Sequence, residues 1–306
     1  MKHITLSRRN FIKHACALPA AVGVMPGTLS AMTNDVIKRV IPSSGEEISI
    51  MGMGTYSTFS HSTPLEQLGE VMQAFFDHGG QMIDSSPMYG PAEGIVGELI
   101  KTTQNTAGYF AATKVWTDGR QAGIDQMNES MELMRVETMD LMQIHNLRDW
   151  KIHLKTLKEW KEQGRIRYLG ITTSHGRFHG ELEAIMKTEP LDFVQLTYSA
   201  ANRATDARLL PLAQDRGIAT IINRPYQGGD LFRKVKGKPL PDWAAEIDCA
   251  SWGQFFLKFI AGHPAVTCII PATSKVKHIL DNMAGGTGRV PDAAQRKRMI
   301  DYLEAL

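Results

Sequence analysis

The sequence predicts an α/β protein: a single (β/α)8 TIM barrel with a parallel, eight-stranded core and a short N-terminal hairpin. Eight apolar, β-branched runs recur at intervals of about thirty residues, and amphipathic helical patterns separate them. No Pro/Gly/Ser-rich linker divides the chain. Eight such units in about 270 residues fit one closed barrel domain.

The first thirty-one residues have a different character. Arg8 and Arg9 precede a weakly apolar stretch, and the segment ends in Leu29-Ser30-Ala31. A basic start, an apolar middle and a small-residue end are typical of a signal peptide, and the arginine pair favours the twin-arginine route. We therefore expect residues 1–31 to engage the twin-arginine export machinery and residues 36–306 to form the mature, periplasmic domain. The alternative interpretation is a disordered basic tail.

Charge and hydropathy limit the partners of the mature protein. Residues 1–31 carry four cations and no acid, so a chain of net charge +2 leaves a remainder of −2. This balance predicts no nucleic-acid surface. The apolar stretch of the signal is shorter than the roughly 20 residues of a transmembrane helix, so we expect no stable membrane insertion of the mature protein.

The repeating pattern begins near Val40. A turn at Ser43-Ser44-Gly45 predicts a hairpin over residues 40–48 that closes the barrel floor. The predicted strands are Ile48–Thr55, Gln81–Ser85, Tyr109–Val115, Met139–His145, Tyr168–Thr172, Phe193–Tyr198, Ala219–Arg224 and Val266–Pro271. The predicted helices include Pro64–Asp77, Glu93–Thr102, Asp125–Met134, His153–Gln163, Leu182–Lys187, Ala207–Arg216 and Ser251–Ala261. Gly79, Gly164 and Gly217 follow helices, where a left-handed residue ends the last turn. An open, doubly wound sheet is the other fold considered, but its G-x-G-x-x-G turn is missing after the first strand.

Four polar residues fall at the carboxyl ends of consecutive predicted strands or just beyond them. They are Asp84, Tyr89, Lys114 and His145. Asp84, Lys114 and His145 are about one βα unit apart, so a barrel brings them to one rim. Each alone has a structural explanation, as a helix cap, a solvated cation or a polar strand end, and only the set indicates a site.

The four residue types suit the reduction of a carbonyl group. The developing alkoxide needs a proton, and a tyrosine with an ordinary pKa of about 10 is a weak acid at neutral pH. An adjacent ammonium lowers that pKa, and an aspartate keeps the lysine charged and in place. A histidine can orient the carbonyl oxygen. We therefore interpret Tyr89 as the acid, Lys114 and Asp84 as its tuning pair, and His145 as the donor to the carbonyl.

Several motifs resemble those of the aldo-keto reductases. Met51-Gly52-Met53-Gly54-Thr55 is similar to the opening strand of that family, and Asp84-Ser85-Ser86-Pro87-Met88-Tyr89-Gly90, with Ala92-Glu93 and Gly97-Glu98, resembles its longest signature. Thr113-Lys114 and Gln143-Ile144-His145 match its lysine and histidine motifs. The resemblance covers about residues 40–282. It implies a Tyr/Lys/His/Asp tetrad, a small-molecule carbonyl substrate and a nicotinamide cofactor held by the later strands.

The cofactor motifs depart from the family pattern in several places. The family usually has Ser-Asn after the fifth strand to hold the nicotinamide amide, whereas this chain has Thr172-Thr173, and Thr173 offers only a hydroxyl. Gln195 matches a family glutamine. The segment with Arg224 and Tyr226 resembles the pyrophosphate loop, but Arg224 is unusual there and could contact either a phosphate or an anionic substrate. The remaining candidates, at the adenosine end, are Thr273, Lys275 and Asn282.

The adenosine end leaves the choice of cofactor open between two dinucleotides. Ala272 and His278 stand where NADP-preferring members have Lys and Arg. Lys275 can compensate, so NADPH is favoured and NADH remains possible. The structural alternative places Lys275 and His278 in the polar first turn of a surface helix.

Two further functions stay open. One is an NADP(H)-binding redox sensor or partner-regulating barrel with little turnover, and the other is a barrel hydrolase or isomerase. Cys249 and Cys268, the cysteines beyond the predicted signal, form no CxxC or Cys/His cluster, so no metal site is expected and buried free thiols are favoured over a disulfide.

Overall fold

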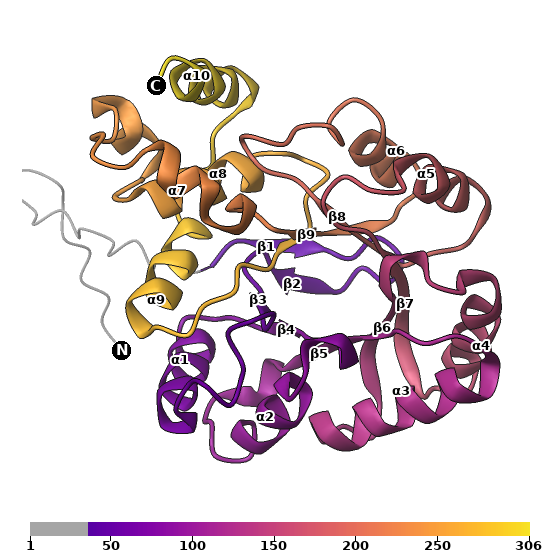
Figure 1. The fold of residues 1–306 in the computed structure, drawn as a ribbon. Coiled ribbons are helices and arrows are strands. Elements are labelled where there is room, and N and C mark those ends of the chain that lie inside the picture. Colours follow the sequence, from indigo (N-terminus) through magenta and orange to yellow (C-terminus); the bar gives the residue numbers. More distant parts are fainter. Residues whose placement is uncertain (1–35) are drawn as a thin grey trace, which may run out of the picture. The chain divides into compact units, whose positions relative to one another are not determined.

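The computed structural model describes residues 36–306, so the predicted signal at residues 1–31 lies outside the described part of the chain. Eight parallel strands form its central sheet, in the order β10-β9-β8-β7-β6-β5-β4-β3 (Figure 1). Their bounds are β3 Met53–Gly54, β4 Met82–Asp84, β5 Phe110–Val115, β6 Met139–Ile144, β7 Ile166–Thr172, β8 Phe193–Thr197, β9 Ala219–Asn223 and β10 Cys268–Ile269.

The sheet closes between its first and last strands. Parallel bridges join Met51 to Ile269 and Gly54 to Ala272. The N–H of Gly52 donates to the carbonyl of Ile269 over 2.8 Å. The barrel prediction is therefore confirmed, and the open doubly wound sheet is excluded.

The first predicted strand, Ile48–Thr55, is wrong as a single element. Its start belongs to β2, Glu47–Ser49, and only Met53–Gly54 joins the barrel as β3. The chain between them passes very close to β10. A Cβ at Gly52 would lie 2.9 Å from Cys268 Sγ, and one at Gly54 would lie 2.9 Å from the carbonyl oxygen of Ile270. Glycine is required at this closing seam because there is no room for a side chain.

The predicted hairpin is confirmed at the amino end of the barrel. Strand β1, Lys38–Val40, pairs antiparallel with β2 across the turn. Ile41 and Ile48 are fully buried and belong to a cluster of strand side chains that includes Phe110, Tyr168 and Phe193. The hairpin thus closes the barrel floor, and burial of each large apolar side chain contributes roughly 1.5–3 kcal/mol.

Ten helices of the described region surround the strands (Figure 1). They are α1 Leu65–Asp77, α2 Ala92–Leu99, α3 Arg120–Met134, α4 Trp150–Glu162, α5 His179–Thr188, α6 Leu209–Asp215, α7 Asp230–Lys234, α8 Trp252–Ala261, α9 Val276–Gly285 and α10 Ala293–Glu304. Gly79, Gly164 and Gly217 have φ of +79°, +71° and +64°, as predicted for residues that end helices. Asp292 caps α10 by accepting from the N–H of Gln295 over 2.8 Å, and Gln295 Oε1 accepts from the N–H of Asp292 over 3.0 Å.

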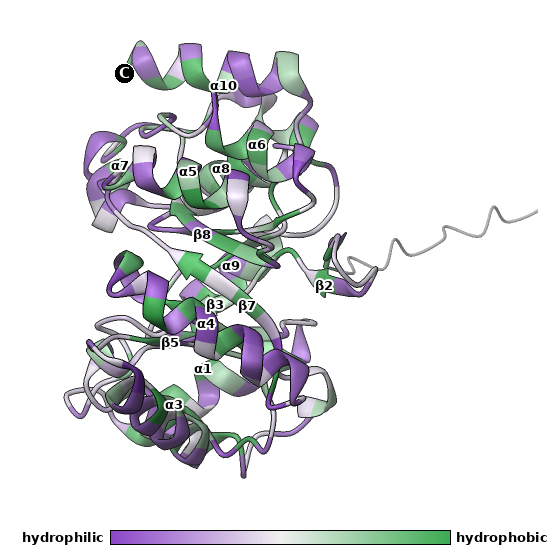
Figure 2. Ribbon diagram, turned by 90° about the vertical axis from the view of Figure 1, so that its right-hand side faces the viewer, coloured by the Kyte–Doolittle hydropathy of each residue, from purple (hydrophilic) through white to green (hydrophobic). Residues whose placement is uncertain are grey.

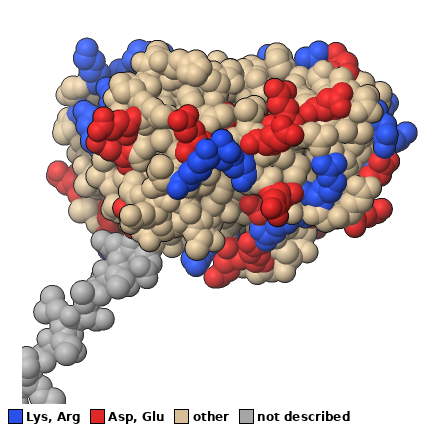
Figure 3. All heavy atoms as spheres, turned by 90° about the horizontal axis from the view of Figure 1, so that it is seen from below, with Lys and Arg blue, Asp and Glu red and all other residues tan. Residues whose placement is uncertain are grey.

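The second, larger hydrophobic cluster lies between the strands and the helices. Figure 2 shows β7 and β8 mostly in hydrophobic colours, whereas α3 and α10 alternate between hydrophilic and hydrophobic residues along their length. Amphipathic helices such as α1 bury one apolar side, here Leu68, Val71, Met72, Phe75 and Phe76, whereas α8 is buried along most of its length. Seen from below, the surface mixes cations and anions over the face drawn (Figure 3).

Both described cysteines are buried and unpaired, as predicted. Burial raises the pKa of the Cys249 and Cys268 thiols to about 12, which keeps them protonated and unreactive. Within residues 36–306 every helix is too short or too polar to cross a membrane.

Candidate active site

The structure brings the four predicted catalytic residues to the carboxyl end of the barrel. Asp84 is the last residue of β4, Lys114 lies near the end of β5, and His145 directly follows β6. Tyr89 ends a short 3-10 turn after β4, which Ser86 caps by accepting from the N–H of Met88. Because the three strands are adjacent and parallel, their ends meet at one rim.

Lys114 and Asp84 form a fully buried ion pair. Lys114 Nζ lies 2.6 Å from Asp84 Oδ2 and 2.6 Å from the carbonyl oxygen of Ser85. The side chains are 0% and 2% exposed. Burial alone would lower the pKa of Lys114, but Asp84 and Tyr89 more than compensate and raise it above its ordinary value. The lysine is therefore a permanent cation at the base of the site.

Tyr89 lies against this cation. Lys114 Nζ is 4.9 Å from the centre of the Tyr89 ring. From the sequence, Lys114 was expected to lower the pKa of Tyr89. That pKa is instead raised, because the burial of the phenol outweighs the attraction of the cation. The hydroxyl consequently stays protonated at neutral pH and lies next to a buried cation, an arrangement that is chemically able to donate a proton.

His145 is held neutral beside the tyrosine. Its ring is perpendicular to that of Tyr89, at 88° and 5.8 Å between ring centres. Burial and the nearby Lys114 charge lower the pKa of His145 to about 3. Ser86 Oγ lies 2.9 Å from Nδ1, so Nε2 is the nitrogen available to a ligand. A neutral imidazole with its proton on Nε2 can donate to a carbonyl oxygen without carrying charge.

The depressed pKa of His145 predicts a pH dependence of stability. The native state binds the proton only near pH 3, whereas the unfolded chain binds it near pH 6.5, so stability falls as pH falls from about 6.5 toward 3. Between pH 7.5 and 4.5, we expect the free energy of unfolding to fall by about 2–3 kcal/mol more in wild type than in His145→Gln. Urea unfolding at both pH values measures this. Equal losses in the two proteins would contradict a neutral, buried His145.

Two amides hold Asp84 in a role that was not predicted: from the sequence, Gln195 was expected only as a cofactor contact and Gln143 only as part of the histidine motif. Gln143 and Gln195 each donate from Nε2 to Asp84 Oδ1, over 2.9 and 3.0 Å. Asn223 Nδ2 in turn donates to Gln195 Oε1 over 3.3 Å. Gln143 lies two residues before His145. Residues two apart on a strand share a face, so the sequence could have predicted that Gln143 points toward the site. Gln195 and Asn223 lie on β8 and β9, and only barrel closure brings them across.

The predicted contacts to the nicotinamide amide lie together at the end of β7. Thr172 and Thr173 are both 1% exposed. Thr172 Oγ1 accepts from the N–H of Asn146, and Asn223 Nδ2 donates to the carbonyl of Thr173 over 2.9 Å. Thr173 Oγ1 is buried without a hydrogen-bond partner in residues 36–306. Such an atom fits a ligand that brings its own amide, because an unsatisfied buried hydroxyl is otherwise costly.

The candidates for the rest of the dinucleotide fall in two groups. Tyr226 donates to Asn282 Oδ1 over 2.6 Å, which joins the loop after β9 to α9. Thr273 Oγ1 accepts from the N–H of Lys275, and exposed Lys275 precedes the first residue of α9. The start of a helix favours anions, and an adjacent cation such as Lys275 would strengthen the binding of a phosphate there. His278 lies in the first turn of α9, so the surface-helix alternative describes the local structure correctly without excluding a phosphate contact. Arg224 lies two residues before Tyr226, in the same loop after β9, and the carbonyl of Arg224 accepts from the N–H of Gln227 over 2.9 Å.

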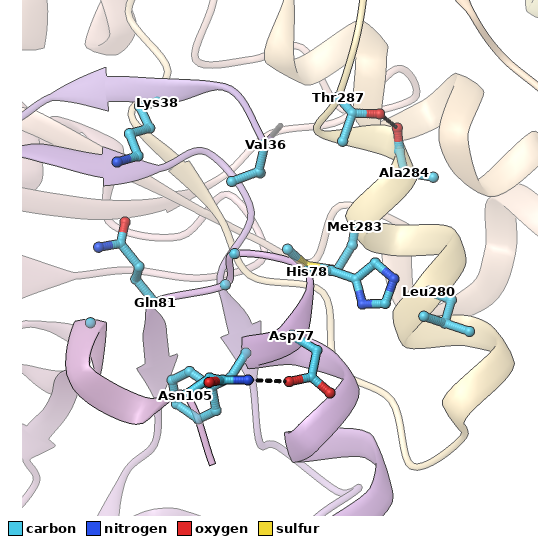
Figure 4. Close-up of a pocket in the computed structure, with 14 residues that line it drawn as sticks. Val36, Lys38, Asp77, His78, Gln81, Asn105, Leu280, Met283, Ala284 and Thr287 are labelled. Atoms are coloured by element: carbon cyan, nitrogen blue, oxygen red, sulfur yellow. Dashed lines mark hydrogen bonds between the residues drawn. The ribbon is translucent and has the colours of Figure 1, made fainter. Parts of the chain in front are cut away.

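A cavity of about 940 Å³ lies away from these residues (Figure 4). It is lined by segments that precede β4 and β5, among them Gly80, Gln81 and Asn105, together with the end of α9. Asp77 points at Asn105 across its lower edge, at 2.7 Å. The cavity is therefore at the amino end of the barrel, opposite the tetrad. Among residues 36–306, no group of three or more His, Cys, Asp or Glu side chains is placed to hold a metal ion.

Comparison with known proteins agrees with this geometry. Residues 50–292 match the Aldo/keto reductase family. The chain is 26% identical over 217 residues to aldo-keto reductase YhdN of Bacillus subtilis, a match that covers 64% of this chain and 63% of that protein. It is 22% identical over 253 residues to methylglyoxal reductase YeaE of Escherichia coli, covering 81% and 89%.

Solved structures show the same fold. An aldo/keto reductase from Klebsiella pneumoniae, in complex with NADP and acetate, superposes with a TM-score of 0.73 at 20% identity, covering 88% of this chain and 96% of that one. The family match spans most of the chain and includes each of the four rim residues. The chain belongs to the aldo/keto reductase family.

Proposed function

We propose that this protein reduces an aldehyde or ketone to the alcohol with NADPH, with Tyr89 as the proton donor. The observation that carries the proposal is the buried Lys114–Asp84 pair beneath the Tyr89 ring. A protonated phenol, a fixed cation and a neutral imidazole at one rim are what the reduction of a carbonyl requires.

Each side chain has a separate task in this reaction. The bound dinucleotide supplies the hydride. His145 Nε2 orients the carbonyl oxygen, which then receives the proton of the Tyr89 hydroxyl. Lys114 stabilises the resulting phenolate, and Asp84 holds Lys114 in place over 2.6 Å. Thr172, Thr173 and Gln195 would hold the nicotinamide, and Tyr226, Thr273, Lys275 and Asn282 the remainder of the dinucleotide.

NADPH is proposed ahead of NADH for two reasons. Lys275 is exposed where α9 begins, so its ammonium can meet a 2′-phosphate. The Klebsiella neighbour holds NADP. Loss of nicotinamide absorbance, followed with each cofactor over a panel of aldehydes, ketones and quinones that includes methylglyoxal, tests the reaction and the cofactor together. Tight cofactor binding without turnover on any compound would instead support the NADP(H)-binding sensor.

We further propose that residues 1–31 direct export by the twin-arginine route and that the protein leaves the cytoplasm already loaded with its nucleotide. The basis is the sequence pattern around Arg8 and Arg9. We expect fractionated cells to contain a shortened protein in the periplasm, and Arg8→Lys/Arg9→Lys to retain it inside. Finding only the uncleaved protein in the cytoplasm of wild-type cells would contradict export.

A further inference from the structure

We propose that Arg224, together with His175 and Arg177, forms an anion-binding subsite beside the tetrad, which takes a carboxylate or phosphate carried by the carbonyl substrate. This inference rests on the proposed reductase function and names its substrate class.

Arg224 is a half-buried cation that lacks a counter-ion. Its Nε is buried and has no hydrogen-bond partner among residues 36–306. None of the ion pairs formed within those residues includes Arg224, Arg177 or His175. The side chain of Arg177 makes only long hydrogen bonds, of 3.4 Å, with Ser174 in its own loop. A guanidinium removed from water needs a partner, and a planar anion is the group that it binds best.

Arg224 has a left-handed backbone, which it shares with ten other non-glycine residues of the described region, His175 among them. The φ of Arg224 is +51°, in the left-handed region where residues other than glycine are uncommon. The loop that follows leaves room for the side chain, because a Cβ at Gly228 would lie 3.3 Å from Arg224 Nη2. Strained backbone of this kind collects at functional sites, where it aims a side chain.

Partly buried hydrogen bonds join the two loops of this subsite. The N–H of His175 donates to Thr197 Oγ1 over 3.0 Å, and Thr197 Oγ1 donates to Asn223 Oδ1 over 2.6 Å. Asn223 immediately precedes Arg224. The charges of Arg224 and Arg177, after burial, also lower the pKa of His175, which places the three groups within electrostatic reach of one another. The subsite is therefore a built cluster on the loops after β7 and β9.

The same bonds join the subsite to the rim of the barrel that carries the tetrad. Asn223 reaches Asp84 through Gln195. The loop of His175 meets Asn146, the neighbour of His145, through Ser174 Oγ, which is 3.0 Å from His175 Nδ1 and 3.5 Å from Asn146 Oδ1. Lys275, the candidate for the 2′-phosphate, lies at the start of α9 rather than on the loops of Arg224 and His175. An anionic tail bound at Arg224 would leave the carbonyl end of the same molecule to reach Tyr89 and His145.

The test compares substrates that differ only in an anionic group. Succinic semialdehyde is paired with butanal, and glyceraldehyde 3-phosphate with glyceraldehyde. For Arg224→Gln we expect kcat/KM to fall about 10- to 100-fold for the anionic members, as expected for the loss of a charge-assisted hydrogen bond, and to change less than about threefold for the neutral ones. The control is Arg208→Gln, which removes an exposed cation that pairs with Glu183 elsewhere on the barrel. We expect this variant to leave kcat/KM unchanged for both the anionic and the neutral substrates.

Binding measurements separate the alternatives. We expect the affinity for NADPH, measured by titration of protein fluorescence, to be unchanged in Arg224→Gln, and calorimetry to show succinate binding to the NADP-loaded wild type at least tenfold more tightly than to the variant. The proposal would be overturned if Arg224→Gln bound NADPH more weakly and lost kcat/KM equally for the anionic and the neutral substrate of each pair. That result would assign Arg224 to the cofactor phosphates. If no compound is turned over, the reductase function fails by itself, and the succinate titration still decides whether the subsite binds an anion.

Discussion

Replacing Tyr89 with phenylalanine is expected to lower kcat by about 10²–10⁴-fold, the usual contribution of a positioned acid. The change removes the only atom that the mechanism asks this side chain to provide. Phenylalanine keeps the ring and its packing against His145 and Tyr56, whose rings lie 5.8 and 5.1 Å away. The affinity for NADPH should therefore be preserved, and the loss should appear in kcat rather than in folding.

Tyr56→Phe is the matched control for this experiment. Tyr56 lies edge-on to Tyr89 but is 55% exposed, and its hydroxyl has no place in the mechanism. We expect its kcat to stay within about threefold of wild type. Steady-state rates of NADPH oxidation compare the three proteins. A Tyr89→Phe enzyme as active as wild type would show that the proton comes from another group.

Replacing Lys114 with methionine is expected to affect both stability and rate. Breaking a fully buried ion pair destabilises a protein by about 3–5 kcal/mol, because the remaining charge has lost its partner. Here Asp84 would keep only the two amide donors, Gln143 and Gln195. The phenolate of Tyr89 would also lose its stabilising cation, so kcat should fall even in the folded fraction.

A second substitution separates these two effects. In Lys114→Met/Asp84→Asn no buried charge is left unpaired, so we expect urea unfolding to recover a substantial part of the lost stability while kcat stays low. Arg120→Met, which breaks an exposed pair with Glu159, serves as the control and should hardly change stability. If the double variant were no more stable than Lys114→Met, the loss would come from packing rather than from the uncompensated carboxylate.

Local sequence determined much of the fold of the described region. The strand and helix periods, and the glycines after helices, reflect interactions between near neighbours in the chain, so they are readable without a structure. The first barrel strand was predicted wrongly because its apolar residues are buried in two different places. Ile48 closes the floor, whereas Met53 pairs in the barrel, and a run of apolar residues does not distinguish these environments. The start of α3 at Arg120, rather than at Asp125, was missed because the first turn carries little apolar pattern.

The tetrad residues were also identifiable from sequence, because the spacing of one βα unit places their strand ends at one rim. Their electrostatics were not. The pKa of Tyr89 depends on how deeply the phenol is buried, and the pKa of His145 on its burial beside Lys114, which are properties of the closed barrel. Burial changes the free energy of a charge by more than a single exposed neighbour does, so the sign of these shifts follows from tertiary packing.

The sequence by itself therefore determined the repeating βα architecture, the family and the identity of the four rim residues, since each depends on local pattern and on order along the chain. Tertiary structure alone decided which residues act together across the barrel. Gln195 reaches Asp84 from a strand 111 residues away, and Thr197 links the loops of His175 and Arg224. Hydrogen bonds and charges act through space over a few ångströms, and only closure of the barrel brings these distant segments within that range.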